Sequence, residues 1–577
     1  MMSAIWIRRF ALAGLLAGAA QGALAQEATG GEAPLNAGAY LAARAAGGAS
    51  DFVAASDYFL QALQDDPGNA ALYENALTSL VGMADMDRAI SLSQDMVDAG
   101  INSQVAHMLL VMQAAVAEDW PSIVAAPAAG RGVGPLVDGL STGWAHVGLG
   151  EMAEALAAFD TVIDAPGLRA FGLYHKGLAL AVAGDFEAAD AIFSMSPQDG
   201  MQQTRRVILA HAQVLSQLGR NPDAVALIDA TFGNNLDPGL SDLRMRLSAG
   251  EPVPYRFVNN ARQGLAEVYF SIGTALGGQT SETYMLMYAR IVNLLDPSHV
   301  EAVLFTAQLL EDMAQFDLAS AAYNMVPRED MAFHAAEMGR AAVLRRAGRA
   351  DAAVEVLEQL TRTYPDLAVV HATLGDTLRG MQRFREANEA YSRALSLYDD
   401  ADPARWFVLY TRGMTYHRLE DWAAAEADLR QSIAIKPGQP QVLNYLGYSM
   451  VERGENLDEA LAMIEEAVRA QPQNGAVVDS LGWVQFRMGL FDDAVFHLER
   501  AAELLPIDPV INDHLGDAYW AVGRLNEARF QWQRALSFDP AEVDADRIRS
   551  KLEIGLDQVL AQEGAAPLRM AQDASNP

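Results

Sequence analysis

The sequence predicts an all-α fold in which pairs of helices stack into a solenoid. The clearest indication is a pattern between residues 440 and 540 that recurs with a period of about 34 residues. Three successive segments share a Leu-Gly pair, two alanines and a final proline: Leu446-Gly447, Leu481-Gly482 and Leu515-Gly516; Ala460, Ala494 and Ala528; Ala467, Ala501 and Ala535; Pro472, Pro506 and Pro540. Small residues let two helices approach closely, and proline ends the second helix because it lacks a donor and clashes with the preceding turn. One pair cannot bury its own apolar face, so we expect the pairs to stack.

This pattern resembles the tetratricopeptide (TPR) repeat, a helix-turn-helix unit of about 34 residues. The resemblance implies an all-α TPR solenoid, a right-handed superhelix of helix-turn-helix repeats. Units with the same spacing of small and large apolar residues extend back along the chain, and about fourteen can be placed in all. Their pattern is weaker before residue 237.

The chain is expected to fall into seven regions. Prolines and glycines between residues 238 and 263 do not align with a repeat unit, and apolar residues at helical spacing follow the last unit. The predicted regions are a signal peptide (1–25), a flexible leader (26–35), a degenerate N-terminal TPR array (36–237), an irregular connector (238–263), a C-terminal TPR array (264–542), a capping helix (543–562) and a disordered tail (563–577).

The first 25 residues have the pattern of an export signal. Arg8 and Arg9 precede an apolar run from Phe10 to Ala20, and Ala23-Leu24-Ala25 is typical of a cleavage site. The apolar run is too short for a membrane span, which needs about 20 residues. We therefore expect cleavage after Ala25 and a mature protein without an integral span, in the periplasm or outside the cell.

Composition excludes several classes of function. The formal net charge is −33, and removing Arg8 and Arg9 with the signal peptide gives −35. Such acidity argues against nucleic acid and anionic membranes as partners. The sequence contains no cysteine, which excludes disulfides, thiolate metal sites and the acylated cysteine of a bacterial lipoprotein.

No catalytic, metal-binding or cofactor-binding motif is found. The ten histidines are scattered without the spacing of a zinc protease site, and no Gly-rich loop ends in Lys-Ser or Lys-Thr. Three glycines around Arg131 favour a plain loop, since no strand is predicted before them. The sequence therefore predicts a protein that is not an enzyme and has no cofactor.

Binding to other proteins is the class of function that remains. In a TPR stack, the first helix of each unit lines the concave surface through repeat positions 2, 5, 9, 12 and 13, which we call the inner-face positions. Aromatic and arginine side chains suit protein interfaces. At the inner-face positions of the C-terminal array, such residues alternate with acidic residues. The predicted protein-binding residues are Tyr410, Met414, Arg418, Asn444, Tyr448, Asp479, Trp483, Arg487, Asp513 and Asp517. Packing between units is the alternative interpretation, above all for Tyr448, Trp483, Phe486 and Trp520.

Four segments resemble a more specific family. Residues 443–448, 479–483 and 514–520, together with 261–268, are similar to exported TPR proteins of Gram-negative bacteria. That family includes outer-membrane lipoproteins that act as adaptors of a carboxyl-terminal processing protease and deliver cell-wall hydrolases to it. The resemblance implies such a protease and such hydrolases as partners, whereas the missing lipoprotein cysteine departs from the family.

The sequence thus predicts a scaffold or adaptor of the cell envelope that binds partner proteins through its repeats. A structural assembly factor of an envelope secretion or polysaccharide export machine is the alternative, and an enzyme is the third possibility.

Overall fold

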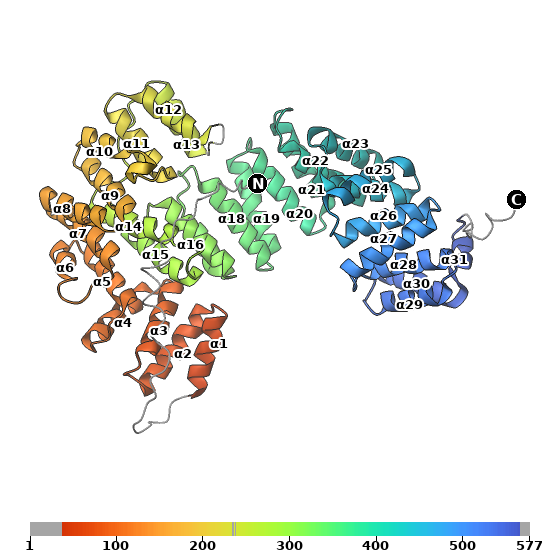
Figure 1. Ribbon diagram of the computed structural model, residues 1–577, viewed down its shortest axis with the longest axis horizontal. Coiled ribbons are helices and arrows are strands. Elements are labelled where there is room, and N and C mark those ends of the chain that lie inside the picture. The colour runs from red at the N-terminus through yellow and green to blue at the C-terminus, as the bar shows by residue number, and fades with distance from the viewer. Residues whose placement is uncertain (1–36, 234–235, 237, 566–577) are drawn as a thin grey trace. The chain divides into compact units, whose positions relative to one another are not determined.

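The computed structural model describes residues 37–233, 236 and 238–565, and every regular element in them is a helix. The predicted signal peptide and leader, and nearly all of the predicted tail, lie outside these residues. The chain divides into two compact units, unit 1 (residues 1–356) and unit 2 (residues 357–577) (Figure 1). The predicted all-α class is confirmed.

The described residues of unit 1 form eighteen α-helices, a 3-10 turn at Pro197–Asp199 and the start of α19 (Ala350–Thr363). The helices are α1 (Ala37–Gly48), α2 (Phe52–Asp65), α3 (Ala70–Gly82), α4 (Met86–Asp98), α5 (Gln104–Val116), α6 (Trp120–Ala125), α7 (Pro135–Leu149), α8 (Met152–Asp164), α9 (Arg169–Val182), α10 (Phe186–Phe193), α11 (Arg205–Gln217), α12 (Asn221–Phe232), α13 (Pro238–Ser248), α14 (Ala261–Ala275), α15 (Glu282–Leu295), α16 (Val300–Asp312), α17 (Phe316–Tyr323) and α18 (Phe333–Arg346).

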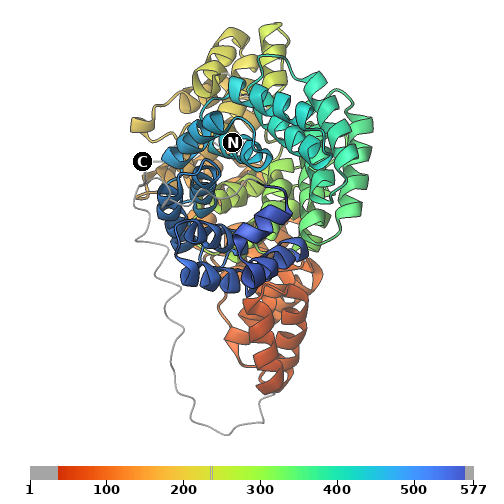
Figure 2. The same ribbon diagram turned by 90° about the vertical axis from the view of Figure 1, so that its right-hand side faces the viewer.

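Unit 2 continues from the end of α19, and Figure 2 shows its helices, from teal to dark blue, following a curved path. They are α20 (Ala368–Gly380), α21 (Phe384–Leu397), α22 (Arg405–Arg418), α23 (Trp422–Ile435), α24 (Pro440–Arg453), α25 (Leu457–Ala470), α26 (Gly475–Arg487), α27 (Phe491–Leu504), α28 (Pro509–Ala521), α29 (Leu525–Leu536), α30 (Glu542–Ile554) and α31 (Leu556–Gln562).

The small residues of the repeat pattern lie where the two helices of a pair cross. A Cβ atom added to Gly482 in α26 would lie 2.5 Å from Leu498 in α27, and one added to Gly516 in α28 would lie 2.5 Å from Trp532 in α29. Ala494 in α27 is fully buried in the same contact. Any side chain at these glycines would force the helices apart, which explains why the pattern recurs.

Aspartate begins the second helix of several pairs. Each of these aspartates accepts a hydrogen bond from the backbone N–H three residues later and is followed by a large apolar residue that starts the helix. The residues are Asp51 in front of α2, Asp85 in front of α4, Asp119 in front of α6, Asp185 in front of α10 and Asp421 in front of α23. An N-cap of this kind satisfies a backbone donor that the helix cannot satisfy itself.

The predicted connector is only partly irregular. Helix α13 occupies Pro238–Ser248, and irregular chain follows up to α14, which begins at Ala261 behind the N-cap Asn260. Pro238 stands at the first position of α13, where a missing N–H is tolerated. The prediction of irregular structure throughout 238–263 was therefore wrong for its first part, because the proline that we took as a helix breaker starts a helix.

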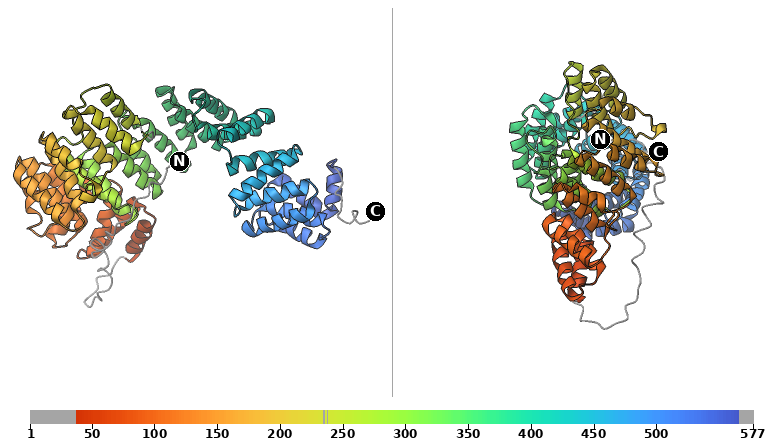
Figure 3. Two further views of the ribbon diagram at one scale, coloured as in Figure 1. Left: turned by 45° about the horizontal axis from the view of Figure 1, so that its top comes forward. Right: turned by 90° about the vertical axis from the view of Figure 1, so that its left-hand side faces the viewer.

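Helices α14 and α15 fold back onto the beginning of unit 1. Helix α14 packs against α7 and α9, and α15 packs against α3 and α5. Figures 1 and 3 show this pair in yellow-green among the orange and red helices. A Cβ atom at Gly264 would lie 2.2 Å from the ring of Trp144, so the α14–α7 contact needs a glycine. The array boundary predicted at residue 264 therefore falls inside unit 1.

The predicted capping helix is two helices. Gly555 separates α30 from α31 with a φ of 85°, a conformation that glycine adopts readily. A Cβ atom there would also lie 2.7 Å from Trp520. The single helix predicted for 543–562 was wrong, because apolar spacing carries no information about this kink.

Candidate protein-binding surface

The inner face of unit 1 is occupied by the chain itself. Trp144 in α7, Tyr174 in α9 and Arg206 in α11 hold inner-face positions, and all three contact α14. Glu267 of α14, only 1% exposed, accepts a hydrogen bond of 2.7 Å from the Tyr174 hydroxyl and one of 2.7 Å from Arg206 Nε. The surface where a TPR array would hold a partner is thus filled by α14.

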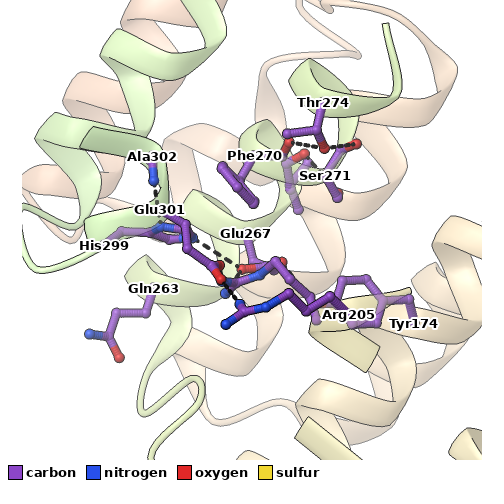
Figure 4. A network of polar contacts seen from close by, with 12 residues as sticks. Tyr174, Arg205, Gln263, Glu267, Phe270, Ser271, Thr274, His299, Glu301 and Ala302 are labelled. Carbon is purple, nitrogen blue, oxygen red and sulfur yellow. Dashed lines mark hydrogen bonds and ion pairs between the residues drawn. The ribbon is translucent and has the colours of Figure 1, made fainter. Parts of the chain in front are cut away.

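A polar network fixes α14 in this position (Figure 4). Glu301 of α16 forms ion pairs with Arg205 and Arg206, and His299 Nε2 lies 3.5 Å from Glu267. Burial opposes ionisation of Glu267, but Arg206 and His299 outweigh it and hold the pKa of this carboxyl well below its usual range. The buried carboxylate therefore stays charged and links α14 to α9, α11 and the start of α16.

Acidification is expected to weaken this fold-back through His175. Trp144 Nε1 donates to His175 Nδ1 at 3.1 Å, and burial lowers the pKa of His175 to about 4, although Glu267 acts in the opposite direction. Unfolded chains take up this proton near pH 6.5, so protonation favours the unfolded state as the pH falls below that value. We expect unit 1 to lose about 3 kcal/mol of its free energy of unfolding between about pH 6.5 and pH 4.

Chemical denaturation over this pH range measures the loss. In a His175→Gln variant, whose amide oxygen can still accept from Trp144, the part of the pH dependence that His175 causes should disappear. An unchanged pH profile in the variant would show that another group is responsible.

In unit 2, two of the predicted binding residues hold the chain's own cap. Lys551 of α30 is fully buried, and its Nζ lies 2.7 Å from oxygens of both Asp513 and Asp517 in α28. Trp532 Nε1 donates to Asp517 at 2.9 Å, and Trp520 Nε1 donates to Asp557 of α31 at 2.9 Å. Helix α30 therefore covers Asp513 and Asp517, two residues that the sequence predicts to contact a partner.

Asp479 and Trp483 are buried as well. Asp479 lies 3.0 Å from His514 Nδ1, and the Trp483 ring stacks on the His514 ring at 3.9 Å. Burial disfavours the charged imidazole, but Asp479 outweighs it and raises the pKa of His514. Trp483 also stacks on Phe486 at 4.9 Å and donates to Glu452 at 2.6 Å. Both side chains thus pack against His514 of the next repeat, and for Trp483 packing between units is the alternative interpretation given above.

The other six predicted residues remain accessible in part. Arg418 and Arg487 are exposed, and the four others are half-buried: Tyr410, Met414, Asn444 and Tyr448. Within the described residues, neither arginine forms an ion pair, and the Tyr410 hydroxyl forms no hydrogen bond. These side chains come from α22, α24 and α26.

Several important residues were not predicted from the sequence. Glu267 and Lys551 form the buried ion pairs, His514 stacks in the core of unit 2, and Tyr445 contacts Tyr410 at a ring distance of 6.0 Å. A signal did exist for two of them. Glu267 interrupts an apolar stretch of α14, and Lys551 is one of very few lysines and lies between apolar residues of the cap.

The close crossing of paired helices and their succession along both units define a helical-repeat protein. Comparison with known families specifies the repeat: residues 140–199 and 373–440 match one model of the tetratricopeptide repeat, and residues 335–367 match another. These stretches of the chain are thus similar to tetratricopeptide repeat proteins. Such proteins are generally scaffolds for protein–protein interaction and are typically not catalytic.

A TPR repeat-containing protein of Pseudomonas aeruginosa is 31% identical over 185 residues, which is 32% of this chain and 29% of that protein. The chain thus matches less than a third of the length of this relative. Among solved structures, a chain of the APC/C hetero-tetramer Cut9–Hcn1 is 14% identical, with 90% of this chain and 96% of that chain covered and a TM-score of 0.37. A tetratricopeptide repeat protein from Parabacteroides merdae is 15% identical, with coverage of 44% and 98% and a TM-score of 0.36.

The described residues contain no group of three or more His, Asp or Glu side chains placed to hold a metal ion. A search of the same residues finds no helix with the length and apolarity needed to cross a membrane.

Proposed function

We propose that this protein is a non-enzymatic adaptor of the cell envelope that binds partner proteins on unit 2, with a carboxyl-terminal processing protease and cell-wall hydrolases as those partners. One structural observation carries the proposal. Inner-face side chains of unit 1 are covered by α14, whereas in unit 2 an exposed arginine and half-buried aromatic residues of α22 and α24 remain accessible. Aromatic and arginine side chains supply much of the binding energy at protein interfaces.

The export signal in the sequence and the resemblance to envelope adaptors support the location and the kind of partner. Gln26 would begin the mature chain, which reaches the compartment where cell-wall hydrolases act. Without a cysteine for acylation, we propose that the protein acts in the periplasm as a free adaptor rather than as a lipid-anchored one.

Affinity capture from an envelope extract tests this function. The mature chain should recover a protease, and a Phe407→Ala/Arg418→Ala variant of α22 should recover clearly less of it. The matched control is a Phe496→Ala/Arg469→Ala variant, which also removes one exposed aromatic ring and one exposed arginine, but from the second helices α27 and α25.

The outcomes separate the two candidate functions. Equal loss in both variants, or no loss in either, would contradict binding at α22. Recovery of components of an export machine as a stable complex would favour the structural assembly factor instead.

A further inference from the structure

One stretch of inner-face positions remains open in unit 2. The inner-face residues of α28 are covered by α30, and those of α26 are mostly buried in packing between repeats. On α20, α22 and α24 the inner-face positions are exposed or half-buried, apart from the buried Val451. We call six accessible residues on or next to these positions the tyrosine strip: Arg379, Phe407, Tyr410, Met414, Arg418 and Tyr445.

The rings of the tyrosine strip form a continuous row. Phe407 lies 6.4 Å from Tyr410, and Tyr410 lies 6.0 Å from Tyr445 in an edge-to-face arrangement. His417 Nδ1 is 2.9 Å from the Tyr445 hydroxyl, which holds that ring in place. Phe407 is 43% exposed, so its ring presents apolar surface to solvent. A row of this kind can receive the side chains of an extended chain.

Two arginines lie beside this row, and one of them is next to an aspartate. Arg418 of α22 is exposed and has no ion pair with a described residue, and Arg379 of α20 lies 3.6 Å from Asp376. Burial raises the pKa of Tyr410, and the charge of Arg379 acts against this rise. Burial also lowers the pKa of His417, and Arg418 and Arg453 lower it further.

The surrounding sequence is less acidic than the rest of the chain. Residues 357–450 contain ten Lys and Arg against twelve Asp and Glu, a net charge of −2, whereas the whole chain carries −33. The acidic surface elsewhere would repel an acidic partner, so this stretch is where one can approach.

We infer that the tyrosine strip binds an extended, acidic segment of a partner protein, whose carboxylates pair with Arg418 and Arg379 and whose apolar side chains lie on Phe407, Tyr410 and Tyr445. The inference rests on the proposed adaptor function and specifies the chemistry of its partner. Carboxylates suit this surface because guanidinium groups bind them through paired, charge-assisted hydrogen bonds. A basic segment would be repelled by Arg379 and Arg418, and it could form no ion pair with Arg418.

A labelled peptide of alternating glutamate and leucine, measured by fluorescence anisotropy with the mature chain, tests the inference. We expect saturable binding that weakens with added salt. An Arg418→Glu variant should lower the affinity at least about tenfold, because it replaces a charge-assisted contact by repulsion. The control is Arg469→Glu, which also reverses an exposed charge, on the second helix α25, and should leave binding unchanged.

Two further measurements make the test specific. The imidazole pKa of His417, followed by NMR, should rise when the acidic peptide binds, because carboxylates are added beside two arginines. A peptide with lysine in place of glutamate and a single-stranded oligonucleotide serve as competing probes. Equal binding of the lysine peptide, tighter binding of the oligonucleotide, or equal loss in both arginine variants would overturn the inference.

These measurements distinguish a failure of the acidic-segment inference from a failure of the proposed adaptor function. If the mature chain captures a protease through α22 but does not bind the acidic peptide, the partner chemistry is wrong and the adaptor function stands. If neither binding is seen, both proposals fail.

Discussion

Replacing Glu267 by alanine is expected to lower the free energy of unfolding of unit 1 by about 3–5 kcal/mol. The carboxylate is 1% exposed and bonds to Arg206 and Tyr174, so its removal leaves the Tyr174 hydroxyl without this partner and leaves the Arg206 guanidinium with Glu301. Removing one partner of a buried ion pair costs far more than the loss of a contact at the surface. Urea denaturation followed by circular dichroism measures the difference.

The matched control for this prediction is Glu251→Ala. Glu251 also accepts from an arginine of unit 1, Arg246 at 3.0 Å, but it is 53% exposed. Solvent screens such a pair, and its loss should cost at most about 1 kcal/mol. Similar costs for both variants would mean that the Glu267 network does not hold α14 in place.

Replacing Lys551 by methionine is expected to destabilise the C-terminal end of unit 2 by about 3–5 kcal/mol. The ammonium is fully buried between Asp513 and Asp517, and methionine fills a similar volume without the charge. Arg547, at 3.6 Å from Asp517, replaces only part of the lost interaction. The fluorescence of Trp520 and Trp532, which lie beside this cluster, reports unfolding of the cap.

A rescue variant distinguishes charge from packing in this cluster. In a Lys551→Met/Asp513→Asn/Asp517→Asn chain no carboxylate is left without a cation, so stability should partly return. Lys176→Met, at a partly exposed ion pair with Asp160 in unit 1, should cost little. If the triple variant is no more stable than Lys551→Met alone, the loss arises from packing rather than from the buried acids.

Contacts within one helix pair were the most predictable part of this protein. Gly516 and Trp532 are separated by sixteen positions and meet where their two helices cross, as Gly482 and Leu498 do in the preceding pair, so their spacing is visible in the sequence. The accessible positions of α22, such as Tyr410 and Arg418, follow from the same register. Their role in binding stays a prediction, which the variants of α22 test.

The sequence by itself determined the helix pairs, their glycine and alanine crossings and their all-α class, because these depend on residues close together in the chain. Only the tertiary structure decided which inner-face positions remain open. Trp144 is covered by Gly264, and Asp517 is covered by Lys551, through contacts between segments far apart in sequence. The repeat pattern describes contacts within a helix pair and between neighbouring pairs, so it cannot indicate where one part of the chain folds back over another.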